Sequence, residues 1–272
     1  MELTQSTYLT ALILTKNEEP NLNRVLEKLT WLEKVVILDS FSTDSTLQIA
    51  QSYPNTVVFQ RIFDTHANQW NYGLSLLDSK WVLSLDADYV LTDEFIKETK
   101  KIIEYPENTA YVVKFKFLVF GKKLLGDNTI PRPVLFELSE CKYYDDGHTQ
   151  RLTINGKTGK FNSYILHDDR KSLSRWISNQ DGYAIKESKK LLSASQSKLS
   201  LTSKIRKTKI FAPVFVFFHC LFVKRLIFNG WTGWHYTLQR TMVEMLLALR
   251  LIEEENLAEG TENQQKVDNR KH

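Results

Sequence analysis

Cysteine and long apolar runs are scarce in this chain. Its 272 residues include only two cysteines, Cys141 and Cys220, which lie far apart and have no metal-ligand spacing. A disulfide framework or a zinc site is therefore not expected, and the reducing cytoplasm fits best. No segment reaches the roughly 18–20 apolar residues that a membrane-spanning helix needs. The nearest, 210–223, contains His219 and precedes two basic residues, which favours a buried or interfacial helix.

Glycine-rich phosphate loops are also missing. The first expected strand is not followed by Gly-x-Gly-x-x-Gly, which argues against a dinucleotide-binding fold. No Gly-x-x-x-x-Gly-Lys-Ser/Thr motif is present, which excludes a P-loop nucleotidase. Residues 1–10 are polar and lack the basic and apolar pattern of a secretory signal. A fold that binds a nucleoside diphosphate through side chains and a metal remains possible.

Charge is modest in total but uneven along the chain. The net charge is +4, yet the segment 186–209 holds eight Lys or Arg residues and a single acid, Glu187. Because the net charge is small and no recognition module is visible, we expect no nucleic-acid partner. The length fits one large α/β domain, or one domain with an appendage.

The first hundred residues alternate apolar strands with helical patterns. Strands are expected near 8–14, 34–38, 57–59 and 81–86, and apolar residues recur with helical period between them. We expect Ser42 or Asp44 to cap the second helix and Thr92 to cap the helix after the fourth strand. This alternation predicts an α/β fold with a doubly wound, mostly parallel sheet and a Rossmann-like nucleotide-binding half.

The pattern changes after about residue 110. Val113, Phe115 and Phe117 alternate with Lys114 and Lys116, and Asn155-Gly156 is a hairpin signal, so a small antiparallel extension is expected. Ser172 is placed to cap an amphipathic helix. We therefore expect three parts: a catalytic α/β domain (1–190), a basic and aromatic helical region (191–252) and a polar, disordered tail (253–272).

Two carboxylates close the fourth expected strand, in the run Leu85-Asp86-Ala87-Asp88. Open α/β sheets place their ligands at the carboxyl ends of strands. Carboxylate oxygens there suit a hard cation, Mg²⁺ or Mn²⁺, and such a cation could hold a substrate diphosphate. The motif alone is weak, because two solvated loop aspartates would look the same.

Polar groups at three strand ends carry a family resemblance. In order they are Leu-Thr-Lys-Asn-Glu-Glu from Leu14, Ile-Leu-Asp-Ser-Phe-Ser-Thr-Asp from Ile37, and Leu-Asp-Ala-Asp from Leu85. The order resembles family-2 glycosyltransferases of the GT-A fold. The later segment 165–173, with Trp176, Gln180 and Tyr183, resembles the branch that builds lipopolysaccharide core and related surface glycans. The resemblance implies an inverting, metal-dependent hexosyltransferase that moves a sugar from a nucleoside-diphosphate sugar, typically a UDP-sugar, to a lipid-linked acceptor.

The resemblance also implies roles for individual residues. Thr15, Asn17 and Glu18 match the loop near the ribose and the diphosphate, and Asp39 matches the acid that binds the base.

Other positions match the groups around the diphosphate. Asp86 and Asp88 match the diphosphate–metal motif, with Asp88 as the direct ligand, and His167 matches a late histidine that completes the metal shell. Arg132, Arg151 or Arg170 could assist the leaving diphosphate. His167 could equally be a core histidine.

The sequence departs from its relatives at the general base. The position that carries an acid in many of them, about six residues before the Asn-Gly turn, is Gln150 here. An amide cannot accept the proton of a sugar hydroxyl, so we expect Asp146, and after it His148, to act as the base. The alternative is that both only shape the loop.

The C-terminal region combines basic residues with many aromatic residues. This pattern indicates an interfacial anchor on an anionic membrane, peripheral on the inner face of the cell membrane. The alternative is a packed helical subdomain or a dimer interface. The aromatic residues are Phe211, Phe215, Phe217, Phe218, Phe222, Phe228, Trp231 and Trp234.

Two other functions remain open at this point. A GT-A-like nucleotidyltransferase would need a glycine-rich first loop, which 15–18 lacks. A non-catalytic sugar-nucleotide or glycan-binding paralogue is encouraged only by Gln150.

Overall fold

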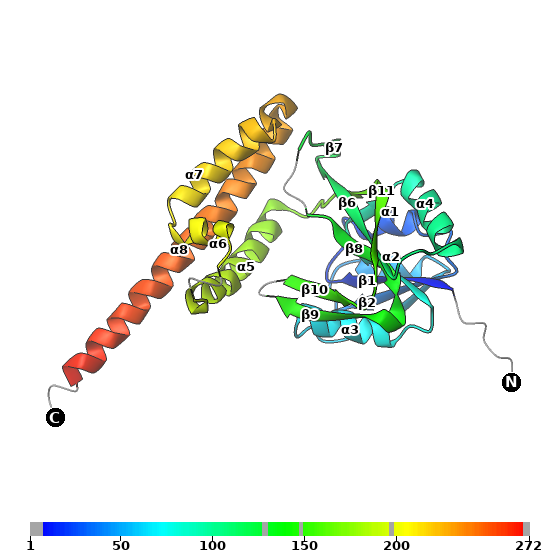
Figure 1. The fold of residues 1–272 in the computed structure, drawn as a ribbon, viewed down its shortest axis with the longest axis horizontal. Coiled ribbons are helices and arrows are strands. Elements are labelled where there is room, and N and C mark those ends of the chain that lie inside the picture. Colours follow the sequence, from blue (N-terminus) through cyan, green and yellow to red (C-terminus); the bar gives the residue numbers. More distant parts are fainter. Residues whose placement is uncertain (1–7, 127–129, 147–148, 196–198, 269–272) are drawn as a thin grey trace. The chain divides into compact units, whose positions relative to one another are not determined.

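The structure of the chain, a computed structural model, describes residues 8–126, 130–146, 149–195 and 199–268. The chain divides into two compact units (Figure 1). The first consists of Met1–Lys123 and Asp127–Lys171, and the second of Leu124–Gly126 and Ser172–His272.

The first half of unit 1 is a parallel sheet with helical crossovers. Its four strands lie in the order β3-β2-β1-β4 and are all parallel to their neighbours. This arrangement confirms the predicted α/β sheet with a Rossmann-like half. The elements are β1 (Leu9–Thr15), α1 (Leu22–Glu27), β2 (Lys34–Asp39), α2 (Thr46–Gln51), β3 (Thr56–Gln60), α3 (His66–Ser75) and β4 (Trp81–Asp86).

The second half of unit 1 extends the same sheet. From β4 the order continues β8-β6-β11-β5, with β7 paired to the end of β6. The pairs β4·β8, β8·β6 and β11·β5 are antiparallel, while β6·β11 is parallel. The elements are β5 (Tyr89–Leu91), α4 (Asp93–Glu104), β6 (Ala110–Val119), β7 (Lys122–Lys123), β8 (Arg132–Glu137), the 3₁₀ turn η1 (Leu138–Glu140), β9 (Cys141–Asp146), β10 (Thr149–Ile154) and β11 (Thr158–His167).

The Asn155-Gly156 turn does not close a hairpin, which corrects the prediction from the sequence. It connects β10 to β11, but β10 pairs with β9 in a separate two-stranded sheet, while β11 pairs with β6 and β5. The turn residues were recognised correctly, because Gly156 has a φ of 139°. The pairing of β10 and β11 with different strands is decided by the burial of β11 inside the sheet. The residues of the turn do not encode that pairing.

Alternating side chains along the strands build two cores, one on each face of the sheet. Leu9, Ala11 and Ile13 of β1 pack with α1, α2 and α4. Leu12 faces the other way and packs with α3 and β9. Because successive side chains point to opposite faces of a strand, these continuous apolar runs give two buried faces, as expected for a sheet covered on both sides.

Helix caps follow the predictions in two of three cases. Thr92 Oγ1 accepts a hydrogen bond from the Phe95 amide at 3.2 Å, and Ser172 Oγ accepts one from the Arg175 amide at 3.3 Å. At α2 the N-cap is Ser45, although Asp44 still accepts a hydrogen bond from the Thr46 amide at 3.0 Å.

Unit 2 is helical. Leucines of α5 and α8 form its core, and Arg206 of α6 binds Glu244 of α8 through two nitrogens, at 2.8 and 3.0 Å. The elements are α5 (Leu173–Ser193), α6 (Leu201–Lys207), α7 (Phe211–Phe218), a π-helical turn η3 (His219–Val223), a 3₁₀ turn η4 (Leu226–Asn229) and α8 (Trp231–Asp268). No helix in the described part of the chain is long and apolar enough to cross a membrane.

Two expected boundaries differ from the structure. The chain divides before α5 instead of near residue 190, because α5 packs on α8 through Leu191 and the Arg250–Asp181 ion pair at 2.7 Å. The segment 253–268, where the sequence predicts a polar, disordered tail, belongs to α8 in the structure. Glu, Ala, Leu and Gln are strong helix formers, and no proline follows Pro213, so nothing stops the helix.

The strained turn at Gly156 supports a stability prediction. A Cβ at this position would lie 2.1 Å from Thr109 Oγ1, and its φ of 139° disfavours any side chain. We expect Gly156→Ala to lower the free energy of unfolding by about 1–3 kcal/mol. The measurement is urea unfolding followed by circular dichroism.

Gly182→Ala is the matched control. Gly182 lies in α5, where an added Cβ meets nothing within 4 Å, so the same change should stabilise by up to about 1 kcal/mol. Equal effects of the two variants would contradict the clash.

Candidate active site

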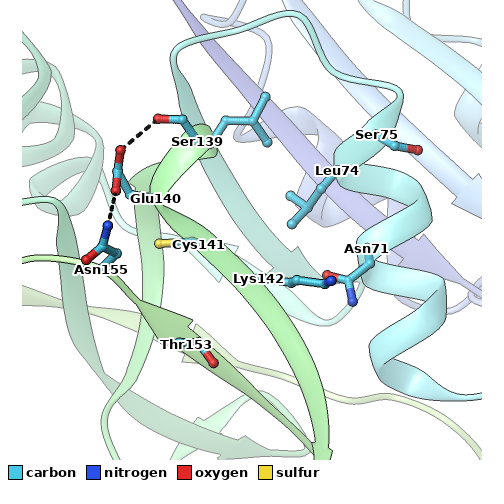
Figure 2. A pocket seen from close by; sticks show the side chains of 10 residues that line it. Asn71, Leu74, Ser75, Ser139, Glu140, Cys141, Lys142, Thr153 and Asn155 are labelled. Atoms are coloured by element: carbon cyan, nitrogen blue, oxygen red, sulfur yellow. Dashed lines mark hydrogen bonds between the residues drawn. The ribbon is translucent and has the colours of Figure 1, made fainter.

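A cavity of about 470 Å³ lies at the amino-terminal edge of the sheet, away from the predicted site (Figure 2). This edge is identified by Leu138, whose amide donates to the carbonyl of Lys80 immediately before β4. The cavity therefore does not include the predicted strand-end residues. It is lined by Asn71, Leu74, Ser75, Leu138, Ser139, Glu140, Cys141, Lys142, Thr153 and Asn155.

The three polar strand ends meet at the opposite, carboxyl-terminal edge. In the parallel register Thr15 of β1 is opposite Asp39 of β2, and Leu14 is opposite Asp86 of β4. The structure thus brings together residues that the sequence placed on three separate strands.

Asp39 is fully buried, and its carboxylate is already bonded on both oxygens. Oδ1 accepts hydrogen bonds from the hydroxyls of Thr15, at 2.9 Å, and Ser42. Oδ2 accepts from the Ser42 amide at 2.8 Å and from Gln60 Nε2 at 3.2 Å. A carboxylate has about four acceptor positions. An incoming donor group would therefore have to replace one of these, and the Gln60 contact is the longest.

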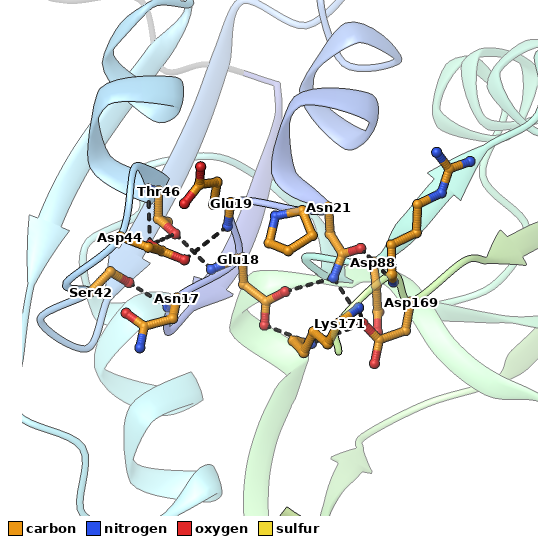
Figure 3. A network of polar contacts seen from close by, with 12 residues as sticks. Asn17, Glu18, Glu19, Asn21, Ser42, Asp44, Thr46, Asp88, Asp169 and Lys171 are labelled. Carbon is orange, nitrogen blue, oxygen red and sulfur yellow. Dashed lines mark hydrogen bonds and ion pairs between the residues drawn. The ribbon is translucent and has the colours of Figure 1, made fainter. Parts of the chain in front are cut away.

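The loop after β1 is held against the loop after β2. The Asn17 amide donates to Ser42 Oγ at 2.7 Å, and Asn17 Oδ1 accepts from the Thr43 amide at 2.7 Å. The Glu18 amide donates to Thr46 Oγ1 at 2.6 Å (Figure 3). Asn17 has a φ of 55°, a conformation that asparagine tolerates better than most residues. These contacts preorganise the edge of the site.

Asp88 and His167 form a pair across the end of the sheet. Antiparallel pairing sets His167 of β11 opposite Tyr89 of β5, and His167 Nε2 lies 3.1 Å from Asp88 Oδ2. The rings of Phe117 and Tyr89 pack against the imidazole, with centroids at 4.1 and 5.2 Å. Burial opposes the charge of Asp88, but His167 and Lys171 together lower the pKa of Asp88 to about 2. Burial likewise opposes the charge of His167, and Asp88 outweighs it and raises the pKa of His167.

Asp86 has a different environment from Asp88. Burial and the neighbouring Asp88 raise the pKa of Asp86, while the charge of Arg132 and a hydrogen bond with Tyr89 act in the opposite direction. Arg132, at the start of β8, is exposed and close enough to Asp86 to act on it electrostatically. The two aspartates are thus held as a pair of unequal carboxylates.

The residues present fit a cation that is shared with a ligand. Within the described residues, Asp88 Oδ1 is buried and has no hydrogen-bond partner. No group of three or more His, Cys, Asp or Glu side chains in the described part of the chain is arranged to hold a metal by itself. Mg²⁺ is commonly bound by one or two carboxylates and completes its shell with substrate phosphates and water. Asp88 supplies such a carboxylate, and His167 lies beside it.

The sequence alone did not identify a second charged layer of the site, built around Lys171 and Asp168. Lys171 Nζ lies 2.9 Å from Glu18 Oε1 and 3.4 Å from Asp169 Oδ1 (Figure 3). Burial opposes its charge, but Asp88, Glu18 and Asp169 raise the pKa of Lys171. Burial is also the main reason why the pKa of Glu18 is raised, with Lys171 acting against it.

Asp168 is held by two arginines. Its Oδ2 binds Arg24 and, at 2.9 Å, Arg170, and its backbone amide donates to the carbonyl of Asp88 at 3.1 Å. The run His-Asp-Asp-Arg-Lys at 167–171 carries a signal for this layer, because four charged side chains directly follow His167, the predicted metal ligand.

Asp146 lies at the end of β9, and His148 lies outside the described residues. β9 begins near the amino end of β4 and passes it, because Tyr143 Oη and Ser84 Oγ are 2.7 Å apart. Asp145 Oδ1 accepts a hydrogen bond from the Ala67 amide at the start of α3, at 3.0 Å. The following residue, Asp146, is therefore carried toward the carboxyl edge of the sheet, where it binds Arg151 at 2.7 Å.

Comparison with known proteins identifies the class. The family model described as "Glycosyl transferase family 2" matches residues 10–169, which is more than half of the chain. The chain therefore belongs to glycosyl transferase family 2, and its curled, mostly parallel sheet is consistent with the GT-A fold of that family.

Individual relatives have low sequence identity to the chain or match only part of it. An uncharacterised glycosyltransferase of Rickettsia felis is 22% identical over 247 residues, covering 83% of this chain and 82% of the relative. The lipopolysaccharide core biosynthesis glycosyltransferase LpsC of Rhizobium meliloti is 33% identical over 95 residues, which is 33% of this chain and 34% of LpsC. The crystal structure of S. aureus TarS 1–349 in complex with UDP-GlcNAc aligns with a TM-score of 0.48 at 15% identity, covering 92% of each chain.

Lys171 gives a prediction about the integrity of the site. Lys171→Met would leave Glu18 and Asp169 without their shared cation, at a position where the lysine side chain is only 12% exposed. We expect a loss of about 3 kcal/mol in the free energy of unfolding, as for other broken buried pairs. Urea unfolding measures it.

Lys34→Met is the control, because Lys34 pairs with Asp78 on the surface and should contribute less than about 1 kcal/mol. Adding Glu18→Gln to Lys171→Met should recover part of the loss. If Lys171→Met is no worse than Lys34→Met, the buried pair has no structural role.

Proposed function

We propose that this member of glycosyl transferase family 2 is an inverting enzyme that uses a nucleoside-diphosphate sugar, preferably a UDP-sugar, as its donor. It transfers the sugar to a hydroxyl of a lipid-linked or lipopolysaccharide-type acceptor. One observation carries the proposal. The strand ends that hold Thr15, Asp39 and Asp86 lie side by side, and Asp88 follows them with an unpaired buried oxygen, among the residues that the structure describes. This is an edge at which parallel α/β sheets bind ligands.

The donor's nucleoside would lie over the ends of β1 and β2. Asp39 would accept a hydrogen bond from the base, in place of the 3.2 Å contact from Gln60. Thr15, Asn17 and Glu18 border the same edge and would face the ribose and the diphosphate. Since Asn17 and Glu18 are tied to the loop after β2 by their backbone amides, this part of the pocket would need little ordering when the donor binds.

The diphosphate would lie near the Asp86–Asp88 motif. Asp88 and His167 would hold Mg²⁺ or Mn²⁺ together with oxygens of the sugar donor, and Asp86, the other aspartate of the motif, would support them. When bound, such a cation supplies Lewis-acid stabilisation of the leaving diphosphate. Arg132, whose charge acts on Asp86, would add a cationic hydrogen-bond donor on the same side.

Asp146 would serve as the general base. Gln150 occupies the position that the family pattern gives to an acid, and it is opposite Asp145 in the β9·β10 register. An amide cannot take a proton from a sugar hydroxyl, whereas a carboxylate at the neighbouring position can. Arg151 is 66% exposed, so it can hold the carboxylate in place and still release it when the acceptor arrives.

The acceptor is proposed from two separate signs. The partial match to LpsC covers a protein described as acting in lipopolysaccharide core biosynthesis. The basic and aromatic helical unit fits an anionic membrane surface, which would place the enzyme peripherally on the inner face of the cell membrane. Both point to an acceptor that is presented by a membrane.

A second candidate, a non-catalytic sugar-nucleotide-binding paralogue, is favoured only by Gln150. It would bind a UDP-sugar without releasing UDP in the presence of acceptors. Turnover by the wild-type chain would exclude it.

Asp88→Asn tests the metal site. We expect kcat to fall by at least about 100-fold, since a cation at the leaving group is worth several kcal/mol. Initial rates of nucleoside diphosphate release are measured with and without EDTA, and added Mn²⁺ should restore the wild type. Calorimetric binding of Mn²⁺ in the presence of UDP gives a readout that does not depend on activity.

Asp93→Asn is the control for this experiment, because Asp93 is 72% exposed and pairs only with Lys28 among the described residues. Full wild-type activity in chelator would show that no metal is needed.

Asp146→Asn tests the general base. We expect kcat to fall by at least about 100-fold while donor affinity, measured by calorimetry, is retained. His148→Ala is compared directly, and a larger loss there would assign the role to the histidine. Losses of only a few-fold in both variants would reject both residues and leave Asp168 and Asp169 as the next acids to test.

A further inference from the structure

Unit 2 carries a row of large apolar side chains that nothing in the described chain covers. On α7 and the π-helical turn after it, Phe211, Val214, Phe215, Phe218 and Phe222 follow the spacing of one helix face and are 51–70% exposed. The opposite face of the same segment, with Ala212, Cys220 and Leu221, is buried. Exposed apolar residues on one helical stripe, in a protein with an adequate core elsewhere, indicate an interaction surface.

The row continues around the turn into α8. Phe228 of η4 is 77% exposed and Trp231, the first residue of α8, is 88% exposed. We call this set, Phe211, Val214, Phe215, Phe218, Phe222, Phe228 and Trp231, the aromatic face. Phenylalanine and tryptophan are side chains that settle at the boundary between headgroups and acyl chains.

The turn that presents the aromatic face is tightly built. At Gly233 a Cβ would lie 1.9 Å from the Leu226 carbonyl oxygen, so only glycine lets α8 start so close to η4. The rings of Phe217 and Trp234 meet at 6.1 Å on the inner side, and α7 lies alongside the first turns of α8 (Figure 1). The aromatic face is therefore held in place by packing beneath it and does not depend on a partner to form.

The part of the sequence that contains the aromatic face carries charge of one sign. Between residues 188 and 243 the sequence has ten Lys or Arg residues and no Asp or Glu. In the described structure Arg206 and Lys209 are paired with Glu244 and Glu255 of α8.

Four further cations in this region, Lys204, Lys207, Lys224 and Arg225, have no acidic partner among the described residues. Cations of this kind beside an apolar face attract an anionic lipid surface.

We infer that the aromatic face is a docking surface for an anionic lipid bilayer. α7 and the η3–η4 turn lie parallel to the bilayer surface, with the aromatic face at the headgroup boundary. A second copy of the chain fits the same face less well, because a two-fold contact would bring its unpaired cations against their own copies. A spanning arrangement is excluded for α7, whose eight residues reach only about 12 Å, against the roughly 30 Å of a bilayer core. The inference rests on the proposed function only in making this bilayer the source of the acceptor.

The experiment uses the full chain and vesicles, without donor or acceptor. Wild-type protein is sedimented with vesicles of phosphatidylcholine and phosphatidylglycerol, and in parallel with phosphatidylcholine alone. We expect strong binding to the anionic vesicles, weaker binding to the neutral ones, and partial release by salt. The triple variant Phe211→Ser, Phe215→Ser, Phe218→Ser should lower partitioning at least about 10-fold.

Matched variants separate the two contributions. Ile62→Ser, Tyr105→Ser and Leu249→Ser remove side chains of 76%, 72% and 63% exposure elsewhere on the chain and should bind as the wild type does. Lys204→Gln, Lys207→Gln and Arg225→Gln should abolish the preference for anionic over neutral vesicles and reduce the salt dependence. Far-UV circular dichroism confirms that each variant is folded.

Three outcomes would overturn the inference. In the first, the wild type binds neither kind of vesicle, and in the second, the Phe→Ser triple variant binds as well as the wild type. In the third, the wild type is a dimer in lipid-free solution, and only the triple variant dissociates while it still binds vesicles. Failure of the proposed function is distinguishable. A chain that binds vesicles but never releases UDP from a UDP-sugar keeps this inference and loses the function, and a chain that transfers sugar without binding vesicles does the reverse.

Discussion

The antiparallel pairing of β5 with β11 is the contact on which the site depends. It sets His167 beside Asp88, although the two are 79 residues apart in sequence. The same pairing brings the segment 168–171 to the loop after β1 and to α1, so that Lys171 meets Glu18 of the loop and Asp168 meets Arg24 of the helix. Without it, the two aspartates after β4 would be an exposed acidic loop with no histidine and no second layer.

Charge balance explains why so many ionisable groups can share one edge. The carboxylates at this edge are balanced by basic side chains. The carboxylates are Glu18, Asp86, Asp88, Asp168 and Asp169, and the basic side chains are His167, Lys171, Arg24, Arg170 and Arg132. Buried carboxylates are tolerated when a cation or several donors compensate them, and are costly otherwise.

In the described residues, the exceptions to this balance are Asp88 Oδ1 and Asp168 Oδ1, which are buried and unpaired. A site that keeps an acceptor uncompensated is arranged for a positively charged or hydrogen-bond-donating ligand, which agrees with the proposed cation.

The two units use opposite strategies. Unit 1 buries its apolar strands on both faces and keeps its polar groups at one edge. Unit 2 leaves a row of phenylalanines exposed and concentrates positive charge beside it, while its core is a small leucine cluster with Arg206–Glu244 and Arg250–Asp181 between helices. The proposed contact with a lipid bilayer would match both the apolarity and the charge of this row.

The sequence by itself determined the alternation of strands and helices, the two caps at Thr92 and Ser172, and the family, because these follow from local spacing and motif order. It also placed the polar groups at the correct strand ends, since a parallel sheet aligns the carboxyl ends of successive strands. The tertiary structure alone decided the partner of β10 and the closing of the site by Lys171 and Asp168. Those features depend on which distant segments share a buried sheet or helix face, and pairing between distant segments leaves no local periodicity to detect.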